Sequence, residues 1–284
     1  SVAAEGTAPL SFQWRFGGAD LPDQTASTLA LDNVQPAAAG TYSVVVTNRV
    51  GVVASAAATL NVHFRLTVSP SVGGSVTTSP AQPSYAPDST MTLTATPSAG
   101  FAFLGWNGDA SGTANPLTVT MSAHKIIVAN FAPTFALTTS VTGEGSVSAR
   151  PAQASYIAGE VVAVTATPAA GCAFVNWSGV SSATTPTISL TMDGNKTLTA
   201  NFKRLRTLSL VVTGQGIVTR TPDAASYLDG SVVQLTAKAA SGWQFVGWTG
   251  AVNGLTDRVS ITMDADKEAG ALFLQLFTVS SSVE

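Results

Sequence analysis

The sequence is poor in the residue types that usually carry catalysis or metal binding. Its 284 residues include one cysteine, Cys172, and two histidines, and 10% of them are charged, with a formal net charge of −3. A single cysteine excludes an intrachain disulfide. Scarce Lys and Arg argue against a nucleic-acid surface, which needs clustered cations. We expect the one basic cluster, residues 203–206, to be solvated at a joint between modules.

Long apolar runs and amphipathic helical stripes are missing as well. No run reaches the roughly 18 residues that span a bilayer, so no membrane span is predicted. Hydrophobic residues still make up 45% of the chain, and Thr, Ser, Ala and Val dominate. β-Branched residues mixed with hydroxyls suit strands that bury one face. The composition therefore predicts an all-β, or at least β-rich, protein with a sizeable core.

One unit centred on a tryptophan occurs three times, and such a repeat overrides a domain count based on length. Equivalent residues are 71 positions apart, without a gap. The period relates Trp106, Trp177 and Trp248; Phe131, Phe202 and Phe273; and Tyr85, Tyr156 and Tyr227. Because three copies keep one spacing, these aromatic residues are predicted to form the structural core of each repeat.

Within each copy the apolar residues alternate with polar ones. In the second copy Val162, Val164 and Ala166 alternate with neighbours that face the other way, and residues 196–202 show the same period. Such alternation indicates strands with one buried face. The Gly-Glu-Gly segment at 143–145 and its copies lie between two short strands and predict a hairpin loop. We expect about five strands per copy and little helix.

Four motifs occur in the same order along the repeats. They are Ser-Tyr-x-x-Gly, Thr-Ala-Thr-Pro, Phe-x-x-Trp-x-Gly and Lys-x-x-x-Ala-x-Phe, all complete in the second copy. On these motifs, residues 63–274 resemble the divergent internalin-B-type B repeats, a family of bacterial surface modules. Copy one has Asp88 at the turn glycine and copy three has Leu272 before the last Phe, so local turns can differ. The resemblance implies small, β-grasp-like modules.

The first 62 residues do not fit the repeat and resemble a bacterial immunoglobulin-like domain. Trp14 takes the place of the core Trp of strand C, and Tyr42 that of the tyrosine corner. Val2 and Val44 then occupy the two cysteine positions, so an apolar pair replaces the disulfide. The resemblance implies a β-sandwich in which strand A is missing. The spacing of strand E is matched by Leu29, Leu31 and Val34.

These observations predict a linear array of modules. An Ig-like β-sandwich that lacks strand A covers residues 1–62. Three B-type repeats follow at 63–133, 134–204 and 205–275. Residues 276–284 are interpreted as the start of a truncated fourth repeat or as a strand donated to another chain. Short joints between the repeats restrict bending, unlike Gly/Ser linkers, and so predict a rod.

No residue is assigned a catalytic role. His63 is at a joint, and His124 is in a turn whose equivalents are Asn195 and Asp266. Neither histidine has a nucleophile and a carboxylate at a recognisable spacing, as a catalytic site requires. We therefore expect a protein that is not an enzyme and that carries no cofactor.

The aromatic residues leave little for a sugar-binding platform, because nearly all occupy positions predicted to be core. Trp243 is the best candidate for a platform, since its equivalents are Phe101 and Cys172. The same equivalence predicts that Cys172 fills a buried apolar slot rather than acting as a nucleophile. A variation in core size is the favoured interpretation of all three residues. The positions assigned to the structural core are Trp14, Tyr42, Trp106, Trp177, Trp248, Phe131, Phe202 and Phe273.

One loop raises the question of calcium. Asp264 and Asp266, with Asp193 in the equivalent loop, supply carboxylates. A calcium loop carries more oxygen ligands and usually a terminal Glu, so a solvated turn is favoured and no metal site is predicted.

The sequence favours a non-catalytic stalk or adhesive segment of a bacterial cell-surface or secreted protein. One alternative is a protomer of an extracellular filament joined by strand donation. Another is a set of accessory modules in a secreted polysaccharide-degrading enzyme. The expected partners are a protein or glycan surface, or copies of the chain itself, without nucleic acid.

Overall fold

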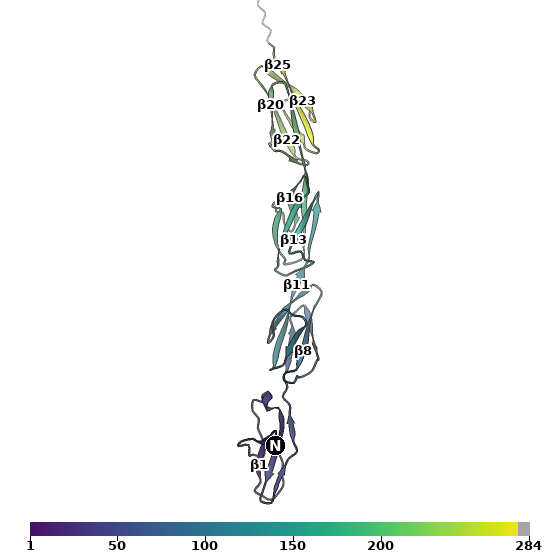
Figure 1. Cartoon of the computed structure of the whole chain (residues 1–284). Coiled ribbons are helices and arrows are strands. Elements are labelled where there is room, and N and C mark those ends of the chain that lie inside the picture. The colour runs from purple at the N-terminus through teal and green to yellow at the C-terminus, as the bar shows by residue number, and fades with distance from the viewer. Residues whose placement is uncertain (278–284) are drawn as a thin grey trace, which may run out of the picture. The chain divides into compact units, whose positions relative to one another are not determined.

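The computed structural model describes residues 1–277, and its regular secondary structure is almost entirely β-strand (Figure 1). One 3-10 turn, Pro36–Ala38, is the helical element among these residues. The chain divides into two compact units, residues 1–133 and residues 134 onward. The predicted all-β array of small modules is confirmed. Residues 278–284, which hold most of the predicted fourth repeat or donated strand, lie outside the described part.

The N-terminal region, residues 1–62, forms one five-stranded sheet in the order β2-β1-β3-β4, with β5 paired to the other half of β3. Trp14 and Val44 face each other across β1 and β3 and are buried with Val46. Val2 and Leu29 pack on the same cluster. The strands are β1 (Ser11–Phe16), β2 (Ala19–Asp20), β3 (Gly40–Thr47), β4 (Val52–Ala54) and β5 (Ala58–Leu60).

The strand predicted from Leu29, Leu31 and Val34 is wrong. Residues 21–39 form turns and the 3-10 turn, and Leu31 and Val34 are 40% and 38% exposed. Residues 1–10 likewise form no strand, although the Val2 amide donates a hydrogen bond to the Ser27 carbonyl (2.9 Å). Non-strand segments therefore cover the face of the sheet that carries Trp14.

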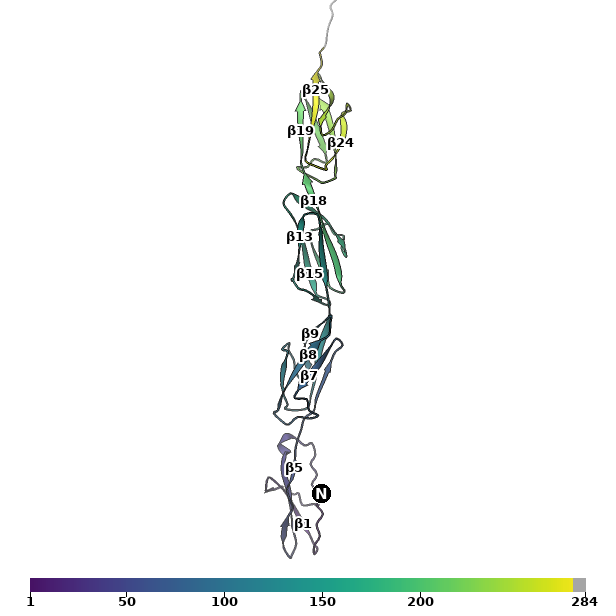
Figure 2. The same ribbon diagram turned by 90° about the vertical axis from the view of Figure 1, so that its right-hand side faces the viewer.

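Repeat 2, residues 134–204, consists of two three-stranded sheets (Figures 1 and 2). In the first sheet, β18 is central, parallel to β12 and antiparallel to β16. The second sheet is an antiparallel β13-β15-β17 meander. The parallel pairing of the first and last strands is the grasp-like feature. The strands are β12 (Leu137–Thr142), β13 (Gly145–Arg150), β15 (Val161–Pro168), β16 (Cys172–Gly179), β17 (Thr187–Thr191) and β18 (Lys196–Arg206).

Repeats 1 (residues 63–133) and 3 (residues 205–275) have the same two sheets. Each therefore has six main strands, one more than the sequence predicts. In repeat 1 they are β6 (Leu66–Pro70), β7 (Gly74–Ser79), β8 (Thr90–Pro97), β9 (Phe101–Gly108), β10 (Leu117–Thr120) and β11 (Lys125–Phe135). In repeat 3 they are β19 (Leu208–Thr213), β20 (Gly216–Thr221), β22 (Val232–Ala239), β23 (Trp243–Gly250), β24 (Arg258–Thr262) and β25 (Lys267–Gln275).

The hairpin predicted at the Gly-x-Gly segments is wrong. The strands on either side, β12 and β13 in repeat 2, belong to different sheets, so the loop crosses between layers. The second glycine permits this crossing because a Cβ on Gly145 would lie 2.6 Å from the Phe202 ring. Gly74 and Gly216 lie against Phe131 and Phe273 in the same way. The segment thus lets the chain cross closely over the phenylalanine ring between the two sheets, and it is not a tight turn.

A shared strand joins repeat 2 to repeat 3. β18 continues past residue 204, and its last two residues, Leu205 and Arg206, already belong to repeat 3, where they pair with β21 (Tyr227–Leu228). Within the second compact unit, β14 (Tyr156–Ile157) pairs with Thr134 and Phe135. At the joint between repeats 2 and 3, the chain therefore passes from one repeat into the next as a continuous strand.

The last strand of repeat 3 reaches the predicted end of that repeat at residue 275. Leu274 and Gln275 still belong to β25, where they pair with Gln244 and Trp243 of β23. Leu276 donates its amide to the Gly242 carbonyl (2.8 Å).

Candidate functional site

The tryptophans of the repeats are core residues with a satisfied polar group. Trp177 is fully buried, and its indole Nε1 donates to the Thr185 carbonyl oxygen at 3.0 Å. Phe174 lies between the Trp177 and Phe202 rings, with centroid distances of 5.3 and 5.7 Å. Trp106 and Trp248 donate to the carbonyls of Ala114 (2.8 Å) and Thr256 (2.9 Å). These rings are enclosed by the core and present no exposed face to a ligand.

The tyrosines tie loops to the strands. In repeat 2 the Tyr156 hydroxyl donates to the Pro151 carbonyl oxygen at 2.9 Å. Tyr42 of the N-terminal region donates to the Ala38 carbonyl oxygen at 2.8 Å, four residues upstream, which is the geometry of a tyrosine corner. Trp14 likewise donates to the Ala26 carbonyl oxygen at 2.9 Å. The equivalent bonds in repeats 1 and 3 join Tyr85 to Pro80 and Tyr227 to Pro222.

His124 accepts a structural hydrogen bond, and its two counterparts accept the equivalent bond in their own repeats. Its Nδ1 accepts a hydrogen bond from the Arg65 backbone N–H at 2.9 Å. Asn195 accepts from Ala136 (2.9 Å), and Asp266 accepts from Thr207 (2.8 Å). His, Asn and Asp all place an acceptor on a short side chain. Sequence reasoning missed this role, although a position restricted to acceptors was the available signal.

The acidic loops use their carboxylates inside the chain. Asp193 pairs with Lys196 at 2.6 Å and Asp264 pairs with Lys267 at 2.7 Å. The hydrogen bond and charge of each lysine lower the pKa of its aspartate, and the Thr207 backbone N–H lowers the pKa of Asp266. Among residues 1–277 no group of three or more His, Cys, Asp or Glu side chains could hold a metal ion.

Cys172 does not fill the buried slot that its equivalents suggest. It is half-buried at the start of β16, opposite Arg204 of β18, and its Sγ lies 3.9 Å from the Glu144 carboxylate. Glu144 also pairs with Arg204, and this contact raises the pKa of the guanidinium. Cys172 therefore lies at the edge of the core, beside an ion pair, where β16 begins.

The basic cluster at 203–206 belongs to the joint between repeats 2 and 3. Arg206 pairs with Asp229 at 2.7 Å, and the Lys203 ammonium donates to the Asp229 carbonyl oxygen at 3.2 Å. The Asp229 amide in turn donates to the Arg204 carbonyl oxygen (2.8 Å). Asp229 has Ala158 and Pro87 as repeat equivalents, so periodicity gave no signal for it. The cluster therefore makes structural contacts with Asp229 and is not a phosphate-binding surface.

Trp243 is half-buried and packs against the core cluster of repeat 3. Its ring lies against the backbone of Gly214, where a Cβ would come within 2.9 Å. Packing against this loop and against the core accounts for the half-buried position of the ring. The variation in size between Phe101, Cys172 and Trp243 is a variation at the edge of the core.

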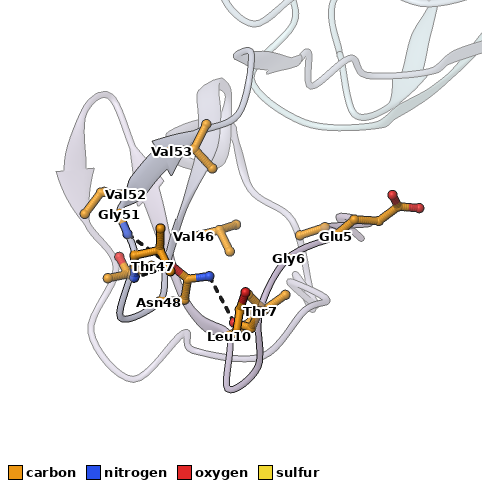
Figure 3. Close-up of a pocket in the computed structure, with 12 residues that line it drawn as sticks. Glu5, Gly6, Thr7, Leu10, Val46, Thr47, Asn48, Gly51, Val52 and Val53 are labelled. Atoms are coloured by element: carbon orange, nitrogen blue, oxygen red, sulfur yellow. Dashed lines mark hydrogen bonds between the residues drawn. The ribbon is translucent and has the colours of Figure 1, made fainter.

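An open pocket of about 400 Å³ lies in the N-terminal region (Figure 3). It is bounded by residues 4–10 on one side and by the end of β3 and the start of β4 on the other. Asn48 closes one end, because its side chain donates to the Thr7 carbonyl oxygen (2.9 Å) and accepts from the amides of Val50 and Gly51. Beside it, Val50, Val52 and Val53 are 77%, 70% and 64% exposed. The pocket contains no convergent acid, base and nucleophile.

A family model of the divergent InlB B-repeat domain matches residues 64–134, 135–206 and 206–275. The chain belongs to the divergent InlB B-repeat family. Repeat and Ig-like modules of this kind are typically non-catalytic, and they suggest a structural or adhesion-type role. No helix within residues 1–277 has the length and apolar character needed to cross a membrane.

Solved structures of Ig-domain arrays are also similar to the chain. Immunoglobulin domains 1–4 of Sidekick-1 show 11% identity, coverage of 94% of this chain and 92% of that chain, and a TM-score of 0.22. The I-band fragment I67–I69 from titin shows 9% identity, coverage of 96% and 90%, and a TM-score of 0.17. TM-scores this low carry no information on function. No curated protein matches the chain.

Proposed function

We propose that this chain is a non-catalytic spacer in a bacterial cell-surface or secreted protein, and that it holds an adhesive or other distal function away from the surface. The supporting observation is that side chains able to do chemistry are tied into structural contacts. The tryptophans, tyrosines, Asp266, Asn195 and His124 each bond to a backbone group of their own module. The pocket of the N-terminal region has no convergent acid, base and nucleophile among its lining residues.

The joint between repeats 2 and 3 supports a spacer rather than a flexible tether. β18 passes from the core of repeat 2 into the ladder with β21, and Arg206–Asp229 reinforces the contact at 2.7 Å. A spacer holds its reach when successive modules cannot fold back on each other, and short joints with paired backbone restrict such motion.

Small-angle X-ray scattering of the purified chain tests the spacer. We expect an elongated pair-distance distribution with a long tail, far beyond that of a compact chain of this length, whose radius of gyration is about 19 Å. A globular profile near that value would contradict the proposal. An alternative chain with a Gly/Ser linker inserted after Arg206 is the matched control, and its distribution should broaden.

A second function, assembly through strand addition, is favoured by the edge of the N-terminal sheet. β4 is a terminal strand of its sheet, and Val52 and Val53 are 70% and 64% exposed. An exposed apolar edge strand can pair with a strand of another chain. Sedimentation at increasing concentration measures this. We expect association that Val53→Lys abolishes, whereas a chain that stays monomeric throughout would contradict it.

A further inference from the structure

The first and last strands of each repeat lie side by side and run in the same direction. In repeat 2, six residue pairs join β12 to β18, from Leu137–Lys196 to Thr142–Asn201. In repeat 3, β19 and β25 pair over six positions in the same parallel sense (Figure 2). In repeat 1, β6 and β11 pair over five. The chain thus enters and leaves every repeat through two neighbouring parallel strands.

This arrangement decides how a stretching force acts on a repeat. A pull on both chain ends draws the first strand backward from its amino end and the last strand forward from its carboxyl end. Because the two strands are parallel neighbours, they are pulled past each other. The hydrogen bonds between them lie across the pulling direction, so the whole ladder is loaded at once. An antiparallel hairpin pulled at its open end would instead lose its bonds one at a time.

We propose that each repeat is a mechanical clamp, in which the parallel ladder between the first and last strands resists tension along the chain. The clamp rests on the proposed spacer function, because a spacer tethered at one end and engaged at the other carries load. The force also has a direct path between modules, since β18 is both the loaded strand of repeat 2 and the strand that pairs with β21 of repeat 3.

The packing behind the ladder opposes the same motion. Leu198 and Ala200 of β18 are fully buried, and Phe202 is 4% exposed beneath Gly145. Sliding of β18 by one residue would turn these side chains from the core toward solvent. The buried contacts of β18 and its hydrogen bonds to β12 are therefore lost together. Rupture of each repeat is then an all-or-none event.

The N-terminal region lacks this geometry within the described residues. Its last strand, β5, pairs antiparallel with β3 over three positions, from Gly40–Leu60 to Tyr42–Ala58. Its first ten residues form no strand. The region therefore has a shorter ladder at its exit and serves as an internal reference of lower mechanical strength.

Single-molecule stretching of the full chain from its two ends tests the clamp. We expect three rupture events that each release about 71 residues, or roughly 230–260 Å of contour before subtraction of the folded length. These events should occur at higher force than one shorter event from the N-terminal region. Ruptures of the repeats at or below the force of the N-terminal event would overturn the proposal.

Two matched substitutions separate the clamp from ordinary stability. Thr199 shares a hydroxyl hydrogen bond with Ser140 across β12 and β18 (2.7 Å), whereas Thr165 shares one with Thr187 across β15 and β17 (3.2 Å). Both pairs are exposed and lie in repeat 2. Thr199→Val removes a bond inside the clamp, and Thr165→Val removes one outside it.

At constant force, Thr199→Val should unfold one of the three repeats about threefold faster, as expected for the loss of one net hydrogen bond. Thr165→Val should leave that rate unchanged while it shifts the denaturant midpoint about as much as Thr199→Val does. Equal acceleration by both variants would overturn the clamp. An extended scattering profile with weak repeats would refute the clamp alone, and a globular profile would refute the spacer.

Discussion

Repeat 2 and the N-terminal region both build their core around a tryptophan whose indole bonds to a backbone carbonyl, yet they differ in depth. Trp177 is one of nine buried residues enclosed by two sheets, whereas Trp14 is one of three on a single sheet covered by non-strand segments. Trp177 is fully buried and Trp14 is 8% exposed. The same motif thus occurs in a module with two sheets and in a thinner region with one sheet. We expect the module with the second sheet to be the more stable of the two.

The largest expected effect tests this difference directly. Trp177→Ala removes a fully buried ring and should lower the free energy of unfolding of repeat 2 by about 3–5 kcal/mol. Trp14→Ala should cost less, because its surroundings contribute fewer buried neighbours. Native-state hydrogen exchange, followed by peptide mass spectrometry, reports each module separately. An equal or larger loss at Trp14 would break the comparison.

The second effect concerns the close contact between Gly145 and the Phe202 ring. Gly145→Ala places a methyl group 2.6 Å from that ring and should destabilise repeat 2 by about 1–3 kcal/mol through overpacking. Gly194→Ala is the control, since its Cβ would meet no atom within 4 Å, and it should stay within about 0.5 kcal/mol. Chemical denaturation measures both. Indistinguishable midpoints would show that the layers can separate to admit the methyl group.

The third effect concerns the joint. Asp229→Asn weakens the pair with Arg206, whose side chains are 23% and 42% exposed in the order Arg206, Asp229, so we expect a loss of about 0.2–1 kcal/mol. Exchange should rise at residues 203–206 as well as in repeat 3. Asp223→Asn, which weakens the Arg220–Asp223 pair inside repeat 3, should leave residues 203–206 protected. Faster exchange there in both variants would argue against a specific joint.

The smallest effect is the response to acid. Lys196 and Lys267 hold the pKa of Asp193 and Asp264 below the ordinary value. A carboxylate whose pKa is lower in the folded chain stabilises it above pH ~4, and this contribution is lost as the pH falls through the folded value. The melting temperature should therefore drop below pH ~4. The Asp193→Asn, Asp264→Asn double variant should show a smaller drop, and an unchanged drop would contradict this origin.

Periodicity alone predicted the repeats, their strand character and the buried aromatic residues. The 71-residue spacing is visible because each repeat must place the same rings in the same core. Alternation says which face of a strand is buried, but not which strand is its neighbour. For that reason Gly143-Glu144-Gly145 suggested a hairpin, although it connects two sheets. Three apolar residues at 29, 31 and 34 similarly lacked a second layer to hold them as a strand.

Contacts between residues far apart in the chain could not be predicted from local sequence. Asp266 and Thr207 are 59 residues apart, and Arg206 and Asp229 are 23 apart. Asp229 has no acidic equivalent in the other repeats, so only the folded ladder brings it to Arg206. Cys172 was misplaced for a related reason, since equivalence in sequence does not tell how far a core tapers at its rim.

Residual dipolar couplings of repeats 2 and 3 in an aligned medium test the central claim, that the shared strand β18 couples these two modules of the spacer. Backbone N–H couplings from residues 137–204 and 207–275 should fit a single alignment tensor, because β18 and β21 join the two repeats through paired backbone. Asp229→Asn should reduce the agreement. Two unrelated tensors in the unaltered chain would show independently tumbling modules and would contradict the account.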